Sequence, residues 1–162
     1  MNIKPIITGV LLLLAVAGVV AVFWQGDAEE PIADTGAAVA ADGLPADGVV
    51  VYYFHGHKRC FTCNKMEALA DEAIWHDFQD LVNDGSVVFK AVNIETDADR
   101  HFIGDYELVN KVVVMSERRD GQEVSWQRLD LVWEKISDDE AYRAYITENL
   151  AASLERVGVE AG

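Results

Sequence analysis

The chain has 162 residues, enough for one domain of ordinary size, and 28 Asp and Glu against 13 Lys and Arg give it a net charge of −15. An acidic surface repels phosphate backbones and anionic lipid headgroups, which argues against nucleic-acid binding and against peripheral attachment to a membrane. Two cysteines are too few for a disulfide-stapled scaffold, and the chain is long enough to form a core without them.

Residues 1–24 are predicted to be a membrane anchor. The run from Ile6 to Trp24 is apolar and uncharged, and as a helix with a rise of about 1.5 Å per residue it would measure about 28 Å, close to the hydrocarbon thickness of a bilayer. Lys4 precedes this run and acidic residues follow it, so the positive-inside rule places the rest of the chain outside the cytoplasm. A cleaved signal peptide is the alternative, although its apolar stretch is usually only about 7–15 residues long.

Residues 25–47 are predicted to be a flexible linker. They are mainly Ala, Asp, Gly, Glu and Pro, and this composition cannot bury enough apolar surface to order itself. A flexible coil of this length spans about 26 Å between its ends. The linker would therefore hold the following domain, residues 48–158, near the membrane.

The first half of the domain has the pattern of a strand, a helix and a second strand. Val49–Phe54 is a continuous apolar run rich in β-branched and aromatic residues, which is typical of a strand buried on both faces. From Cys60 to Val82 apolar residues recur at every third or fourth position, which predicts one long helix that ends near Gly85. Val87–Ile94 is predicted to be the second strand.

The second half predicts a short helical segment, two further strands and a final helix. Residues 97–108 have room for one or two helical turns, and Val112–Met115 is a third apolar run. Asp120-Gly121 is a hairpin signal, after which Val124–Leu129 should return as an antiparallel edge strand. Ser137-Asp-Asp-Glu140 has the form of a capping box that opens the last helix.

This order of elements predicts an α/β domain with a mixed sheet of about four strands and helices on both faces. A strand, a crossover helix and another strand imply parallel pairing, and the hairpin adds an antiparallel partner.

The residues from His55 to Cys63 join the first strand to the long helix and contain both cysteines. Cys60 would lie at the N-terminus of that helix, where free N–H groups and the helix dipole stabilise a thiolate. Lys58 and Arg59 directly precede Cys60 and add positive charge. We therefore expect Cys60 to be the attacking thiol and Cys63, one turn along the helix, to be the resolving thiol of a Cys60–Cys63 disulfide.

From about Val49 to Val157 the chain resembles the thioredoxin fold. It is similar to a small bacterial group with the pattern Phe-His-Gly-x-x-Arg-Cys-x-Thr-Cys, here Phe54 to Cys63, whose members are labelled nitrophenyl compound nitroreductase subunit of the ArsF family. Three later stretches also look like that group: Val92–Glu95, Asp105–Val109 and Leu129–Trp133. The resemblance implies a thiol–disulfide oxidoreductase.

We expect no bound cofactor, because the chain has no Gly-x-Gly-x-x-Gly motif and nothing that resembles a flavin or nicotinamide site. A nitroreductase role would therefore need a partner that carries the cofactor. Two positions also depart from thioredoxins. Those proteins place a cis-proline opposite the cysteines, where this chain has Val112, and a buried acid before them, where it has Phe54.

Metal binding is an alternative for the same stretch. His55, His57, Cys60 and Cys63 are ligand types that suit zinc or copper(I). Because His55 ends a strand and Cys63 lies inside a helix, we do not expect all four to meet at one ion. A static disulfide is the other alternative, although closing so short a loop adds little stability.

The favoured prediction is a single-pass membrane protein whose domain lies on the periplasmic or extracytoplasmic side and exchanges thiols and disulfides with a protein partner. The alternative is a non-catalytic or metal-binding subunit of a membrane-associated redox complex.

Overall fold

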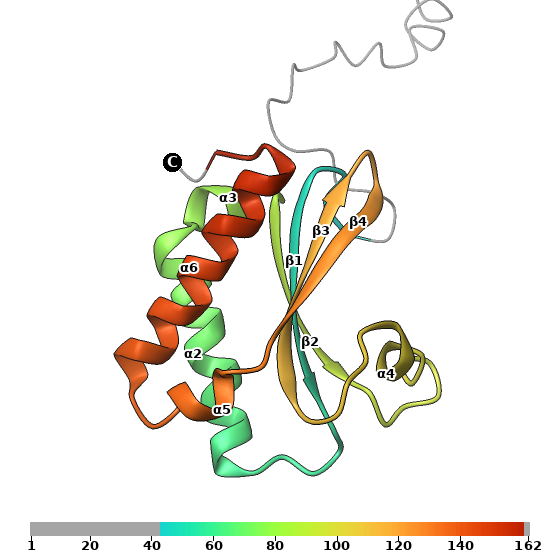
Figure 1. The fold of residues 1–162 in the computed structure, drawn as a ribbon, viewed down its shortest axis with the longest axis vertical. Coiled ribbons are helices and arrows are strands. Elements are labelled where there is room, and N and C mark those ends of the chain that lie inside the picture. The colour runs from blue at the N-terminus through green and yellow to red at the C-terminus, as the bar shows by residue number, and fades with distance from the viewer. Residues whose placement is uncertain (1–42, 161–162) are drawn as a thin grey trace, which may run out of the picture. The chain divides into compact units, whose positions relative to one another are not determined.

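The computed structural model describes residues 43–160, so the predicted anchor and most of the predicted linker lie outside the described residues. The described part is a mixed α/β fold in which helices pack against a four-stranded sheet (Figure 1). None of the helices in residues 43–160 is long and apolar enough to cross a membrane.

Strand β1 (Gly48–His55) lies inside the sheet, whose strand order is β2-β1-β3-β4. Strand β2 (Val87–Asn93) runs parallel to β1, while β3 (Val112–Arg119) is antiparallel to β1 and β4 (Gln122–Leu129) is antiparallel to β3. The predicted mixed sheet is therefore confirmed, with the hairpin strand β4 at one edge.

The turn between β3 and β4 has the conformation that its sequence predicts. Asp120 has φ 53° and Gly121 has φ 76°. Positive φ at both central residues is what a two-residue hairpin needs to match the twist of its strands.

The long helices α2 (Phe61–Asp77) and α6 (Asp139–Val157) lie together on one face of the sheet (Figure 1). The other face carries the single-turn helix α4 (Phe102–Asp105). A further single turn, α5 (Val132–Lys135), leads into α6. Helices on both faces are confirmed, but most of the helical cover is on one side.

The helix predicted to run from Cys60 to Val82 is in fact two helices, so the prediction of one continuous helix is wrong. The break is at Phe78, with φ −129° and ψ 30°, and α3 (Gln79–Asn83) follows it. Phe78 is buried. Leaving the helical conformation at this residue lets its ring enter the core, a tertiary gain that the three- and four-residue spacing does not reveal.

The start of α6 differs by one residue from the predicted capping box. The N-cap is Asp138, not Ser137. The carboxylate oxygen Oδ1 of Asp138 accepts hydrogen bonds from the backbone N–H groups of Glu140 and Ala141, at 3.1 and 3.0 Å. A carboxylate at the N-cap also interacts favourably with the helix dipole.

Strand β3 continues past its apolar run to Arg119, because polar residues in its second half are buried with partners. Glu117 accepts a hydrogen bond of 2.7 Å from Nε of Arg156 on α6. Nε of Arg118 donates at 3.0 Å to the carbonyl oxygen of Pro45. Sequence periodicity could not predict these pairs, which join residues far apart in the chain.

The last residues of the predicted linker, 43–47, are bonded to the β3–β4 hairpin. The N–H of Gly121 donates to the carbonyl oxygen of Ala46 at 2.9 Å, and the N–H of Asp120 donates to Oδ1 of Asp47 at 2.9 Å. The chain therefore enters β1 from the end of the sheet where this hairpin lies.

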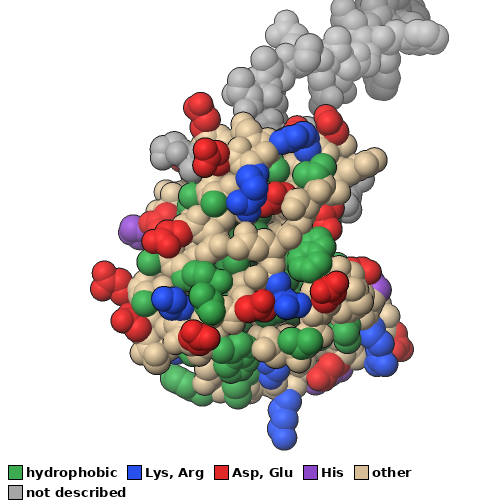
Figure 2. Space-filling view, viewed as in Figure 1, with side chains coloured by type: hydrophobic (Ala, Val, Ile, Leu, Met, Phe, Trp, Pro, Cys, Tyr) green, Lys and Arg blue, Asp and Glu red, His purple; other side chains and the backbone are tan. Residues whose placement is uncertain are grey.

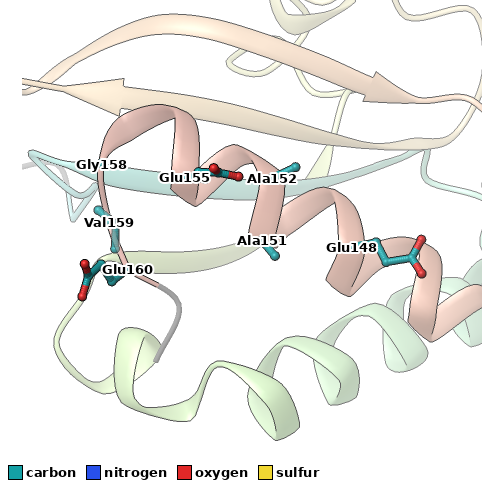
Figure 3. Close-up of a pocket in the computed structure, with 7 residues that line it drawn as sticks. All are labelled: Glu148, Ala151, Ala152, Glu155, Gly158, Val159 and Glu160. Carbon is teal, nitrogen blue, oxygen red and sulfur yellow. The ribbon is translucent and has the colours of Figure 1, made fainter.

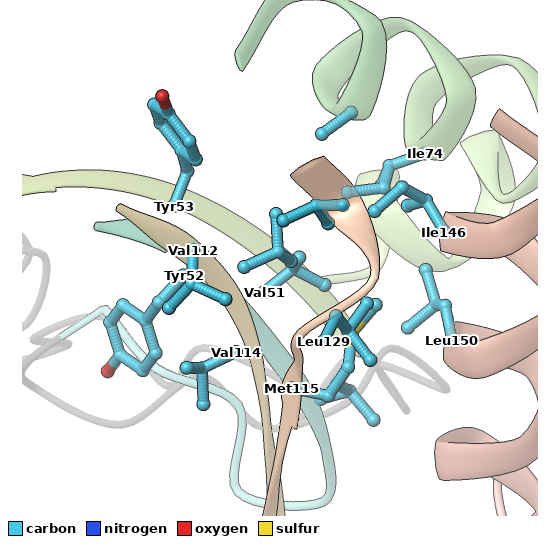
Figure 4. Close-up of a cluster of buried hydrophobic side chains, with 14 of the residues drawn as sticks. Val51, Tyr52, Tyr53, Ile74, Val112, Val114, Met115, Leu129, Ile146 and Leu150 are labelled. Atoms are coloured by element: carbon cyan, nitrogen blue, oxygen red, sulfur yellow. The ribbon is translucent and has the colours of Figure 1, made fainter. Parts of the chain in front are cut away.

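The core has a layer on each side of the sheet (Figure 4). Between the sheet and the long helices, Val51 and Met115 lie on the same side as Ile74 of α2 and Leu150 of α6, while Tyr52 points to the opposite side. The layer on the Tyr52 side of the sheet is aromatic, and the centroids of its neighbouring rings are 5.2–5.9 Å apart. Its members are Tyr52, Phe54, Phe102, Tyr106 and Trp126. Strand β1 is thus buried on both faces, as predicted.

Candidate functional site

The two cysteines lie at the start of α2, directly after the loop that follows β1. Cys60 is the N-cap residue, with the extended values φ −87° and ψ 168°, and Cys63 lies in the first turn. Their Cα atoms are 5.1 Å apart and their sulfur atoms form a disulfide. The backbone N–H of Cys63 donates to Sγ of Cys60 at 3.2 Å, so Cys60 also caps the helix.

The two sulfur-bearing residues differ in exposure. Cys60 is exposed, whereas Cys63 is 0% exposed. Phe61, between them, is 84% exposed. A partner thiol can therefore reach Cys60 but not Cys63, which is the asymmetry that an attacking and a resolving cysteine require.

The two basic residues before Cys60 have different surroundings. The guanidinium of Arg59 forms an ion pair with Glu67, one helical turn beyond Cys63. The side chain of Lys58 is exposed and makes no hydrogen bond or ion pair with the described residues. Part of the positive charge expected at Cys60 is thus neutralised by a carboxylate whose role the sequence did not reveal.

Lys111 is a site residue that sequence reasoning missed. Its ammonium nitrogen Nζ lies 3.3 Å from Sγ of Cys63 and donates at 2.7 Å to the carbonyl oxygen of Lys58. It is 48 residues from Cys63 in the sequence. The sequence offers one indication of its role: Lys111 directly precedes Val112, which occupies the position of the cis-proline that lies opposite the cysteines in thioredoxins.

Tyr53 connects β1 to the first turn of α2. Its hydroxyl donates a 2.8 Å hydrogen bond to the carbonyl oxygen of Cys63. Burial raises the pKa of Tyr53 to about 12, against a smaller opposing effect of the Arg59 charge. Phe54, the next residue, is fully buried in the aromatic layer, so this position supplies no proton-transfer group.

The structure does not bring the two candidate histidines together with the cysteines as one ligand set. His55 is buried, and its Nδ1–H donates to the carbonyl oxygen of Gly56 at 3.0 Å. His57 is exposed and bonded to Glu95 through its backbone N–H at 2.8 Å and its Nδ1 at 2.7 Å. Within residues 43–160 no three His, Cys, Asp or Glu side chains are grouped so that they could hold a metal ion.

Glu95 is held against the loop by its contacts with His57. The hydrogen bonds from the His57 backbone and side chain keep the pKa of the Glu95 carboxyl below its usual range. Gly56 leaves room for this carboxylate, because a Cβ at that position would collide with Oε1 of Glu95. The absence of a side chain at Gly56 therefore permits the His57–Glu95 contact.

A small hollow of about 210 Å³ lies beside the disulfide loop. Its lining includes Gly56, Glu95 and Lys111 together with the apolar side chains of Ile103 and Val109. Val109 is 82% exposed. The hollow therefore combines an apolar rim with one carboxylate and one ammonium group.

A second hollow, of about 1000 Å³, lies along α6 and the residues that follow it (Figure 3). It is lined by Glu148, Ala151, Ala152, Glu155, Gly158, Val159 and Glu160, none of which belongs to the cysteine site. On the face shown in Figure 2, Lys and Arg side chains are interspersed with Asp and Glu rather than gathered in one patch.

Comparison with protein-family models finds no family that matches this chain. A search of the curated proteins finds no match either.

Proposed function

We propose that this protein is a membrane-tethered, extracytoplasmic thiol–disulfide oxidoreductase with a thioredoxin-like domain, and that its partner is a protein dithiol or disulfide. A close Cys-x-x-Cys pair in a mixed α/β domain is compatible with thiol–disulfide exchange. One observation carries the proposal. The exposed Cys60 caps α2 and is disulfide-bonded to the buried Cys63.

The reaction follows from this asymmetry. A thiolate of the partner dithiol attacks Sγ of Cys60, a partner–Cys60 bond forms, and the Cys60–Cys63 bond breaks with Cys63 leaving as a thiolate. The second partner thiolate then attacks the mixed disulfide and releases Cys60. The partner loses two electrons and becomes a disulfide, while the domain gains them as a dithiol. Reduction of a partner disulfide is the same path reversed.

The surroundings of Cys60 support a protein partner. Phe61, directly after Cys60, is exposed, and the small hollow that includes Val109 and Gly56 adds apolar surface beside the loop that leads to Cys60. The chain enters β1 at one end of the strand, and the cysteines follow the opposite end. The eight residues of β1 span about 26 Å. A tether that precedes β1 would thus leave the disulfide accessible.

The test is the reactivity of the reduced full chain with iodoacetamide across pH, for the native protein and for Cys63→Ser. We expect the pKa of Cys60 to lie below the free-thiol value of about 8.5. We also expect Cys63→Ser to form a stable mixed disulfide with a dithiol protein, and Cys60→Ser to form none. A Cys60 that titrates at or above the free-thiol value would overturn the exchange function.

Metal content measured on the same sample separates the alternative function. Stoichiometric zinc or copper that blocks alkylation would indicate a metal-binding subunit, such as the nitroreductase-subunit-like protein that the sequence suggests. The absence of both metal and low-pKa reactivity would indicate a structural disulfide.

The location of the domain has its own test. A membrane-impermeant maleimide should label reduced Cys60 in intact spheroplasts, with the mass of the membrane-bound chain showing that residues 1–24 are retained. Labelling only after lysis would contradict the extracytoplasmic placement.

A further inference from the structure

The sulfur atom of Cys63 is in contact with a positive charge. Cys63 is 0% exposed, and burial by itself raises the pKa of a thiol because it disfavours the charged form. Nζ of Lys111, 3.3 Å away, is the one side-chain donor to that sulfur among the described residues. A leaving thiolate at this position is thus formed next to an ammonium group.

The ammonium is also held by a backbone group outside the disulfide. Nζ donates to the carbonyl oxygen of Lys58 at 2.7 Å. The backbone of Lys111 is fixed independently, since Nε1 of Trp133 donates to its carbonyl oxygen at 2.7 Å. The Trp133 hydrogen bond does not involve the lysine side chain, so it can be kept when that side chain is replaced.

The neighbouring carboxylates are engaged with other groups. Glu95 faces Lys111 across the small hollow, but His57 holds its Oε2 through two hydrogen bonds. Glu67 is paired with Arg59. The Lys111 charge is the smallest of the effects that lower the pKa of Glu95, and its hydrogen bonds go to the Cys63 sulfur and the Lys58 carbonyl oxygen rather than to a carboxylate.

We propose that the Lys111 ammonium stabilises Cys63 as a thiolate when the disulfide opens, and that this makes the pair a better acceptor of electrons from a partner dithiol. The inference rests on the exchange function proposed above. When the partner thiolate bonds to Cys60, the electron pair of the breaking bond stays on Cys63 beside Lys111. A better leaving thiol departs faster, and a stabilised dithiol form raises the reduction potential.

The experiment compares Lys111→Met, which removes the charge but keeps an unbranched side chain, with Lys111→Arg, which keeps the charge. Lys90→Met is the matched control, because it removes the same charge from the middle of β2. Each is made in the full chain, alone and with Cys60→Ser. The first readout is the ultraviolet absorbance of the Cys63 thiolate against pH in the Cys60→Ser background. The second is the thiol–disulfide equilibrium with glutathione.

We expect Lys111→Met to raise the pKa of Cys63 by roughly 1–2 units. It should also make the disulfide about 10-fold harder to reduce at equilibrium, which for a two-electron couple is about 30 mV. Lys111→Arg should keep both the pKa of Cys63 and the glutathione equilibrium close to their native values. Lys90→Met should change neither.

Two outcomes separate this inference from the proposed function. If the native disulfide equilibrates with glutathione but Lys111→Met leaves the pKa of Cys63 unchanged, the lysine only fixes the Lys58 carbonyl and the inference is overturned. If the native disulfide does not exchange at all, the proposed function itself fails, and the inference with it.

Discussion

The hydroxyl of Tyr53 donates a 2.8 Å hydrogen bond to the backbone carbonyl oxygen of Cys63. This bond ties strand β1 to the helical turn that carries Cys63. It also joins a buried tyrosine, whose pKa burial raises to about 12, to the position of the disulfide. Both the stability of the domain and its response to alkaline pH should depend on this contact.

Tyr53→Phe should lower the free energy of unfolding by about 1 kcal/mol at neutral pH, because one buried hydrogen bond is lost. At high pH this difference from the native protein shrinks. The raised pKa means that Tyr53 stabilises the fold fully below about pH 10 and that this contribution disappears as pH rises to about 12. The free energy of unfolding, measured with urea between pH 8 and 12, should decline less steeply for Tyr53→Phe than for the native protein. Equal declines would show that Tyr53 does not titrate in the folded state.

Glu95 should titrate below the usual range of a glutamate in an NMR pH series, because His57 donates two hydrogen bonds to its carboxylate. Its contribution to stability is present above the ordinary carboxyl pKa and is lost as pH falls through the depressed value. His57→Ala should raise the pKa of Glu95 partway, since the backbone bond remains.

Gly56→Ala should raise the pKa of Glu95 further, because the new Cβ displaces the carboxylate from both bonds. His76→Ala, which removes another exposed histidine, serves as the control and should leave Glu95 unchanged. A Glu95 that titrates normally in the native protein would contradict both expectations.

The Arg59–Glu67 ion pair should set part of the reactivity of Cys60 in the reduced protein. Glu67→Gln frees the guanidinium and should lower the pKa of Cys60, whereas Arg59→Met should raise it, each by up to about one unit. The rate of iodoacetamide alkylation against pH measures both. Glu72→Gln, which removes an exposed carboxylate of the same helix, is the control and should leave the pKa of Cys60 unchanged. Shifts of the same sign for Glu67→Gln and Arg59→Met would refute the electrostatic account.

The start of α6 can be tested with two neighbouring alanine substitutions. Asp138→Ala should destabilise the protein by about 1 kcal/mol, because its carboxylate caps two backbone N–H groups. Ser137→Ala should cost much less, because the structure gives Ser137 no capping role. Chemical denaturation of both variants decides between them. A larger loss for Ser137→Ala would restore the capping box that the sequence predicts.

The packing of α6 on the sheet can be tested with two leucines. Leu150 is fully buried, so Leu150→Ala should cost about 2–5 kcal/mol through lost burial and the cavity left behind. Leu131 is 42% exposed, and Leu131→Ala should cost well under half as much. Thermal or denaturant unfolding measures both. Similar losses for the two variants would mean that α6 does not pack as described.

The sequence by itself determined the alternation of strands and helices, the Asp120-Gly121 turn and the placement of Cys60 at a helix start. These features depend on residues close together in the chain, where periodicity and turn conformation act locally. The same patterns missed the break at Phe78 and shifted the last helix cap by one residue. At Phe78 the burial of the ring outweighed the local preference, and at the cap the adjacent carboxylate of Asp138 took the place of the Ser137 hydroxyl.

Only the tertiary structure decided which side chains surround the sulfur atoms. Lys111 reaches Cys63 because β3 pairs with β1 and brings the residue before it to the end of the sheet where α2 begins. Glu95 reaches His57 because β2 lies parallel to β1 on its other side. These neighbours are set by strand order rather than by any local motif, and strand order is fixed by how the apolar faces pack. The sequence therefore identified the cysteine pair, and the fold decided which charged side chains lie beside it.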